Sequence, residues 1–372
     1  MQANNRREFL KKAGAAALSL TITGALASCR RQKRPNIVFI MTDDHTRQAM
    51  SCYGSVINKT PNLDRIAQQG MRFDRCFVSN SICAPSRAVI LTGKFSHLNG
   101  VVDNRTTFDG TQQTFPRLLQ EAGYETAMVG KWHLKSDPTG FDYWNILPGQ
   151  GDYYNPDLIE NGVRKRHQGY VTDIITDISL NWMASTRNPD KPFCLMYHHK
   201  APHRNWMPAL RHLDLYKNEN KEVPETYFDD YSDRGTAARQ QEMEIDDDMV
   251  PSWDLKIGKG DSASDTGMER GWFWKRRRMT DEQLQAWDAA YQSRNQEYKT
   301  TDFTERELAL WKYQAYIKDY LRTVRAVDEN VGKLLDYLKE SGLEKNTLVI
   351  YTSDQGFYLG EHGWFDKRFM YE

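Results

Sequence analysis

Apolar residues along this chain of 372 residues gather in short continuous runs that alternate with segments of helical spacing. The run at 36–42 is rich in β-branched residues, which predicts a strand buried on both faces of a sheet. The segment 61–70 begins with proline and ends with glycine, as helices often do. By the same patterns we expect further helices over 85–92, 114–122, 171–185 and 305–341, and further strands over 124–130, 192–200 and 347–356. This alternation predicts an α/β fold in which helices flank a mostly parallel sheet.

The alternation is lost between residues 208 and 304. This stretch is polar, has little periodicity and carries a tryptophan-rich segment at 271–279. Because long stretches without regular structure are uncommon inside a compact domain, we interpret it as an insertion or a lid. A solvated excursion on the surface is the alternative, and the pattern does not decide between the two.

The first residues have the features of an export signal. Arg6 and Arg7 precede an apolar run of small residues, and the sequence Leu-Ala-Ser-Cys that ends at Cys29 resembles a bacterial lipobox. We expect residues 1–28 to be removed, Cys29 to carry lipid and residues 29–35 to act as a linker. The product is an exported periplasmic or cell-surface lipoprotein that touches the membrane through its lipid only, with a plain cleaved signal as the alternative. The apolar run is too short for a membrane-spanning helix.

The net charge and the cysteine content say little about partners and disulfide bonds. The 50 basic and 50 acidic residues cancel, so no net field indicates a nucleic acid as partner. Five cysteines are present. When Cys29 and Cys83 are set aside, three remain, and the sequence leaves disulfide formation open.

Acidic residues follow two of the predicted strands. Asp43 and Asp44 come after the first strand, and Asp354 and Gln355 come after the last one. Ligand sites in open parallel sheets lie at the carboxyl ends of the strands. Three carboxylates and an amide oxygen that meet there suit a hard cation, Ca²⁺ in preference to Mg²⁺. Zinc is disfavoured because neither a thiol nor paired imidazoles stand at the spacing that zinc sites use.

Cationic and imidazole groups stand near the same predicted edge. Lys131 and His133 follow one strand, His203 follows another, Arg87 lies in a predicted helix and Lys367 lies near the end of the sequence. Each of these residues is commonplace by itself. Together with a cation they supply the kinds of group that stabilise the negative charge of an oxyanion ester.

Two segments connect these residues to a known family. The sequence SICAPSRAVILTG at 81–93 and the sequence GYETAMVGKWH at 123–133 resemble, in order, the two signatures of the type I sulfatases. The similarity runs from about Pro35 onwards. It implies an alkaline-phosphatase-like catalytic domain over 36–372, with the smaller C-terminal subdomain absent from this sequence.

The resemblance also implies a chemistry. Cys83 is expected to be oxidised to Cα-formylglycine by a formylglycine-generating maturation enzyme, and the hydrated aldehyde then attacks sulfur and later expels sulfate. By position, the residues that resemble the calcium ligands are Asp43, Asp44, Asp354, Gln355 and the modified Cys83. Arg87 resembles the group that orients the diol, and Lys131 and Lys367 resemble the sulfate-binding groups. His133 resembles a partner of the diol, and His203 resembles the general acid. Gln355 departs from the Asn that is commoner in the family. His362 is a weaker candidate nearby.

The substrate is indicated by a third segment. Residues 141–162 resemble a stretch of the N-acetylglucosamine-6-sulfatases. The substrate implied is a 6-O-sulfated N-acetylglucosamine in glycosaminoglycan or mucin-type glycans. The alternatives are another sulfated glycan, a phosphoester or phosphonate substrate, and a glycan-binding lipoprotein with an inactive site.

Overall fold

The computed structural model describes residues 34–369 of the chain. The expected export signal, the lipidated Cys29 and the first part of the linker lie outside the described residues. The folded unit begins at Asn36, where the first strand starts. Among the described helices, none is long and apolar enough to cross a membrane.

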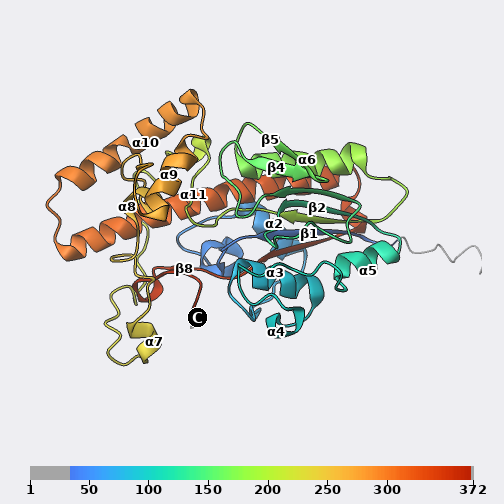
Figure 1. The fold of residues 1–372 in the computed structure, drawn as a ribbon, viewed down its shortest axis with the longest axis horizontal. Coiled ribbons are helices and arrows are strands. Elements are labelled where there is room, and N and C mark those ends of the chain that lie inside the picture. The colour runs from blue at the N-terminus through green and yellow to red at the C-terminus, as the bar shows by residue number, and fades with distance from the viewer. Residues whose placement is uncertain (1–33, 370–372) are drawn as a thin grey trace, which may run out of the picture. The chain divides into compact units, whose positions relative to one another are not determined.

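The centre of the fold is a sheet of seven strands within the described residues (Figure 1). Its order is β5-β4-β3-β2-β6-β1-β7, and the neighbouring pairs from β3 to β7 are all parallel, whereas β4 and β5 add an antiparallel hairpin at one edge. The strands are β1 (Asn36–Thr42), β2 (Glu125–Lys131), β3 (Tyr143–Leu147), β4 (Asp157–Glu160), β5 (Val163–Arg166), β6 (Phe193–His198) and β7 (Thr347–Ser353). The predicted mostly parallel α/β fold is confirmed.

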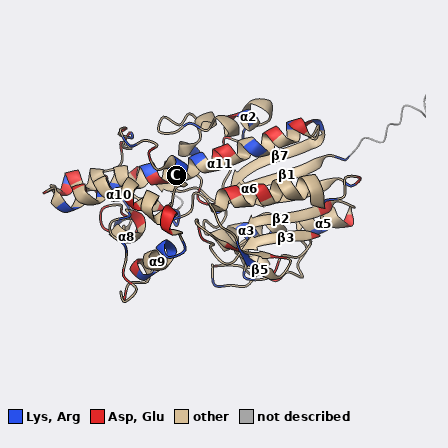
Figure 2. Ribbon diagram, turned by 90° about the horizontal axis from the view of Figure 1, so that it is seen from above, with Lys and Arg blue, Asp and Glu red and all other residues tan. Residues whose placement is uncertain are grey.

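Helices cover both faces of this sheet because successive strand residues point to opposite sides. Val38 and Ile40 of β1 pack in a core shared with α2, α6 and α11, whereas Ile37 and Phe39 pack in a core shared with α3 and α5. Strands β1, β3 and β7 carry no charged residue, whereas the ribbons of the helices are marked by many Lys, Arg, Asp and Glu positions (Figure 2). The sheet helices are α2 (Pro61–Gln69), α3 (Cys83–Thr92), α5 (Phe115–Glu121), α6 (Val171–Asn181) and α11 (Glu305–Glu340).

Helix α11 joins two parts of the core. It begins at a capping box, in which the Thr304 hydroxyl accepts from the Glu307 backbone N–H and the Glu307 carboxylate accepts from the Thr304 backbone N–H. Its second half packs on the sheet, and its first half packs against the loops that follow β6 and β7. Short elements complete the described fold: α4 (Ser96–Asn99), α7 (Thr236–Arg239), α8 (Pro251–Asp254), β8 (Tyr358–Leu359), β9 (Phe365–Asp366) and single turns at Arg47–Ala49, Ser51–Tyr53, Trp182–Thr186, Leu210–His212, Glu344–Asn346 and Glu361–Gly363.

The expectation of little regular structure over 208–304 is wrong for the second half of that stretch. Helices α9 (Gly267–Arg276) and α10 (Asp281–Thr300) form there, and α10 lies beside α11 (Figure 1). Trp272 and Trp287 are buried in the main core, so this part is not a solvated excursion. The helical pattern was hard to see because α10 buries only a few large aromatic residues among many polar ones. Its capping box at Thr280 and Gln283 was the available signal.

A close approach of two strands explains one glycine in the second signature. Gly130 of β2 has φ +106°, and an added Cβ would lie 1.8 Å from the carbonyl oxygen of His198 on β6. We expect Gly130→Ala to destabilise the fold by more than about 4 kcal/mol, because backbone atoms of two central strands must move apart. The measurement is the free energy of unfolding, or the yield of soluble protein. Gly54→Ala is the control, since Gly54 also has positive φ but faces open space. Equal losses in both variants would contradict the steric explanation.

Candidate functional site

The site is built where β1 and β7 end side by side. The two strands pair in parallel up to Thr42 and Ser353, so the residues that follow each strand emerge together. The Asp354 N–H donates to the Thr42 carbonyl at 3.1 Å, and the Asp44 N–H donates to Asp354 Oδ1 at 3.2 Å. Asp44 itself has φ +64°, and Tyr320 of α11 donates to its carbonyl at 2.6 Å. The expected convergence of Asp43, Asp44, Asp354 and Gln355 is therefore present.

These acidic residues form a buried cluster of oxygens. Asp43, Asp44 and Asp354 offer carboxylate oxygens that lie within 4.8 Å of one another, and all three residues are buried. Burial raises the pKa of Asp44 to about 8, helped by the charges of Asp43 and Asp354, and burial and Asp43 also raise the pKa of Asp354. Asp44 Oδ2 and Gln355 Oε1 are buried without a hydrogen-bond partner. Unpaired buried oxygens next to crowded carboxylates fit a hard divalent cation.

Cys83 stands at the start of α3, directly beside this cluster. Its Sγ lies 3.7 Å from Asp43 Oδ1 and 3.5 Å from Lys367 Nζ, and the residue is fully buried. Burial and the neighbouring Asp43 raise the pKa of the Cys83 thiol to about 11. Reactive cysteines have a lowered pKa and some exposure. The geometry therefore places Cys83 at the centre of the site but does not activate it as a thiolate.

Arg87 lies one helical turn after Cys83 and faces the same way. Its Nε and Nη2 donate to Asp354 Oδ2 at 3.1 and 2.9 Å, and Nη2 lies 3.4 Å from Asp43 Oδ2. Its Nη1 donates to the Lys131 carbonyl at 2.5 Å. A buried guanidinium thus joins the ends of β1, β2 and β7, and it fixes the orientation of two carboxylates of the buried cluster.

Two ammonium groups complete the charge balance of the site. Lys131, the last residue of β2, pairs with Asp43, and Lys367, which follows β9, pairs with Asp44. Burial alone would raise the pKa of Asp43, but Lys131, together with His203, Lys367 and Arg87, holds it well below its ordinary value. Asp43 is therefore ionised.

The two expected histidines border the same cluster. His203 lies in the loop after β6, and one of its ring nitrogens is within 4.8 Å of an Asp43 oxygen and of Cys83 Sγ. His133 has φ +57° and a buried, unpartnered Nδ1. Burial and the charges of Lys131 and Arg87 lower the pKa of His133 to about 2. The weaker candidate His362 is directed elsewhere: its Nδ1 lies 2.7 Å from Asp229 Oδ2.

Several residues of the site were missed by the sequence analysis. Gln150 accepts a hydrogen bond from Lys131 Nζ, and Tyr320 holds the backbone of Asp44. Lys200, three residues before His203, is buried with its Nζ 4.9 Å from the centre of the Tyr153 ring. Gln150 lies in the segment 141–162, where the resemblance assigned no role to any single residue. Tyr320 and Lys200 belong to no motif, and only the burial of a polar group identifies them.

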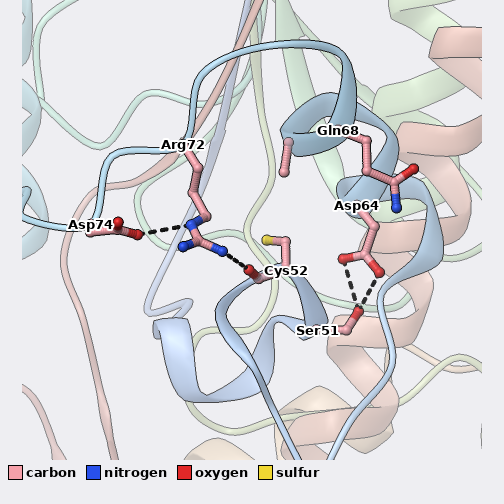
Figure 3. Close-up of a pocket in the computed structure, with 7 residues that line it drawn as sticks. Ser51, Cys52, Asp64, Gln68, Arg72 and Asp74 are labelled. Carbon is pink, nitrogen blue, oxygen red and sulfur yellow. Dashed lines mark hydrogen bonds and ion pairs between the residues drawn. The ribbon is translucent and has the colours of Figure 1, made fainter.

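A surface pocket between the turn at Ser51–Tyr53 and α2 is separate from this site (Figure 3). Its polar groups satisfy one another: Ser51 Oγ donates to the Asp64 carboxylate at 2.8–2.9 Å, and Arg72 donates to Asp74 at 2.8 Å. The residues that line this pocket include none of those expected in the site, so the pocket contributes no group to the chemistry at the ends of β1 and β7.

The fold and the site together define a class of α/β proteins with a buried carboxylate cluster at the strand ends, and comparison with known proteins identifies the family. The sulfatase family model matches residues 35–369. The chain belongs to the sulfatase family, and the resemblance expected from the two signatures is confirmed.

Two curated relatives and one solved structure show which members of the family this chain resembles. The chain is 56% identical over 357 residues to N-acetylglucosamine-6-O-sulfatase of Bacteroides thetaiotaomicron, covering 94% of this chain and 63% of the relative. It is 27% identical over 383 residues to human N-acetylglucosamine-6-sulfatase, covering 95% of this chain and 56% of the relative. The structure of BT4656 with its substrate D-glucosamine-2-N,6-O-disulfate superposes with a TM-score of 0.88 at 55% identity, over 91% of this chain and 69% of that chain. The chain thus spans less than two thirds of the length of these curated relatives.

Proposed function

We propose that this chain carries the catalytic part of a sulfuric ester hydrolase that removes the 6-O-sulfate of N-acetylglucosamine units in glycosaminoglycan or mucin-type glycans. The observation that carries the proposal is the convergence of Cys83, Arg87, Lys131 and Lys367 on the buried carboxylates at the ends of β1 and β7. The likeness to two N-acetylglucosamine-6-sulfatases supports the choice of sugar.

The proposal includes two groups that the chain would hold. The carboxylate oxygens of Asp43, Asp44 and Asp354 would hold Ca²⁺, which would polarise the sulfate when bound. The Gln355 Nε2 donates to Asp44 Oδ1 at 2.6 Å, so the unpartnered Gln355 Oε1 would serve as a further ligand once the amide turns over. Cα-formylglycine, made from Cys83 by a maturation enzyme, supplies a nucleophile that the protonated thiol does not provide. Magnesium is the second choice of cation.

The side chains around these groups have separable tasks. Lys131 and Lys367 neutralise the carboxylates in the free protein, and their ammonium groups are placed to share their charge with the sulfate oxygens. Arg87 keeps Asp43 and Asp354 in place.

His203 donates the proton that the leaving sugar oxygen needs. Burial and the charge of Lys131 lower its pKa well below the ordinary value in the free protein. A bound anionic ester favours the protonated imidazole, so the acid is formed where it is used.

The cellular location of the protein and the roles of its first residues and of the segment 208–304 are further parts of the proposal. We propose that residues 1–28 direct export, that Cys29 carries a lipid anchor and that the segment 208–304 is an insertion that borders the substrate. The apolar run and lipobox-like sequence before residue 30 support the first two. The contacts of α8 with the His203 loop support the third.

The proposed substrate is tested by sulfate release from the purified chain, produced together with a formylglycine-generating enzyme and supplied with calcium. We expect release from 6-O-sulfated N-acetylglucosamine and little from 3-O- or 4-O-sulfated hexosamines, because the pocket must fit the transition state at one position of the sugar. Release only from the other sulfated sugars contradicts the substrate. Release of phosphate from the matching phosphate ester, with no release of sulfate, contradicts the reaction.

A further inference from the structure

The loop that carries His203 is cross-linked to a short helix in the segment 208–304. The Arg204 guanidinium donates from Nε and Nη2 to the two carboxylate oxygens of Asp254 at 2.7 and 2.6 Å. Asp254 is the last residue of α8 and is fully buried, and it also accepts the Val250 N–H at 2.8 Å. Such a two-point pair fixes both the position and the plane of the guanidinium.

A second cationic side chain, that of Lys256 just after α8, contacts the same loop. Lys256 is buried, and its Nζ donates to the carbonyl of Asn205 at 2.5 Å. The same ammonium donates to the carbonyls of Trp253 and Asp254 at 2.9 Å each. All three donors of the ammonium are thereby used within α8 and the His203 loop.

These contacts bear directly on the ring of His203. His203 Nδ1 lies 2.5 Å from the carbonyl oxygen of Arg204, which can only accept, so Nδ1 carries the proton and Nε2 is left for the substrate. The Tyr153 hydroxyl also donates to the His203 carbonyl at 2.7 Å. A shift of the Arg204 backbone therefore turns the imidazole away from its acceptor.

We propose that Asp254, Arg204 and Lys256 are positioning residues that hold His203 for proton donation to the leaving sugar oxygen. The inference rests on the proposed sulfatase function. As the proposed nucleophile at position 83 bonds to sulfur, the bond between sulfur and the sugar oxygen would break. That oxygen would take the Nε2 proton of the His203 imidazolium, the form that a bound anionic ester favours, and the sugar would leave as an alcohol. The buried pair of Arg204 and Asp254 is a poor source of stability for its cost in desolvation, which favours a role in positioning.

The test compares two esters that differ in their need for this proton. A sugar alkoxide is a strong base and leaves only when protonated, whereas 4-nitrophenolate leaves unaided. The variants are Lys256→Met, which keeps the length of the side chain, and Asp254→Asn, which keeps the shape of the carboxylate. For each we expect kcat/KM on 6-O-sulfated N-acetylglucosamine to fall about 10- to 100-fold, a part of what a general acid contributes, with little change on 4-nitrophenyl sulfate.

Controls separate the possible outcomes. Asp288→Asn breaks an ion pair with Arg276 in the same segment without touching the His203 loop, and it should leave both rates unchanged. An equal loss on both esters, or no loss on either, overturns the positioning role. If the unaltered chain does not turn over 4-nitrophenyl sulfate, a lower kcat at unchanged KM for the sugar ester supports the role, and a raised KM at unchanged kcat overturns it. An unaltered chain that is inactive on both esters contradicts the proposed function instead.

Discussion

Cys83→Ala is expected to lower sulfate release by at least about 10⁴-fold, since it removes the atom from which the nucleophile is made. Cys83→Ser should be as inactive when the protein is matured by an enzyme that acts on cysteine. The fold should persist in both variants, because Cys83 is a small buried residue whose thiol makes only weak contacts with the side chains of Asp43 and Lys367. The measurement is the rate of sulfate release at saturating substrate, with the melting temperature recorded for each variant.

The same prediction can be checked without activity. Trypsin is expected to release residues 76–87, which contain both Cys76 and Cys83. We expect mass spectrometry to show loss of the thiol and gain of an aldehyde at Cys83, while the exposed Cys76 is alkylated normally. Cys76→Ser is the matched control and should retain full activity. An unmodified Cys83 in active protein would refute formylglycine as the nucleophile.

Calcium is expected to raise the melting temperature of the chain by several degrees, and Asp354→Asn is expected to remove that response. A ligand at a hundred times its dissociation constant stabilises the folded state by about 2.7 kcal/mol. Asp354 has an oxygen within 4.8 Å of oxygens of Asp43 and Asp44, and Arg87 orients it. Replacing its carboxylate therefore removes a calcium ligand and leaves the buried Arg87 guanidinium without its charged partner. Thermal unfolding with calcium and with a chelator measures the difference directly.

Two comparisons make the calcium test decisive. Asp64→Asn changes a carboxylate of the separate surface pocket and should keep the full calcium response. A response that survives in Asp354→Asn would contradict the assignment of the site. Magnesium that stabilises the unaltered chain as strongly as calcium would favour the second choice of cation.

Much of the fold and of the site was predictable because the relevant signals are local. Strand β1 was expected over 36–42 and is found there, and α11 was expected over 305–341 and ends one residue earlier. The acidic residues after β1 and β7 were expected to meet because parallel neighbouring strands end at one edge, and the register of Thr42 with Ser353 brings them together. Helix α10 was missed because its few buried aromatic residues give a weak periodic signal.

The sequence by itself determined the class of fold, the two signatures and the kinds of group around Cys83, because apolar periodicity and motifs are patterns of residues that are close together in the chain. Only the tertiary structure decided which residues support them. Contacts between segments far apart in the chain place Gln150 and Tyr320 in the site. Such contacts also connect the positioning residues Arg204, Asp254 and Lys256. Their effect comes from burial and from hydrogen-bond geometry, which arise only when those segments pack together.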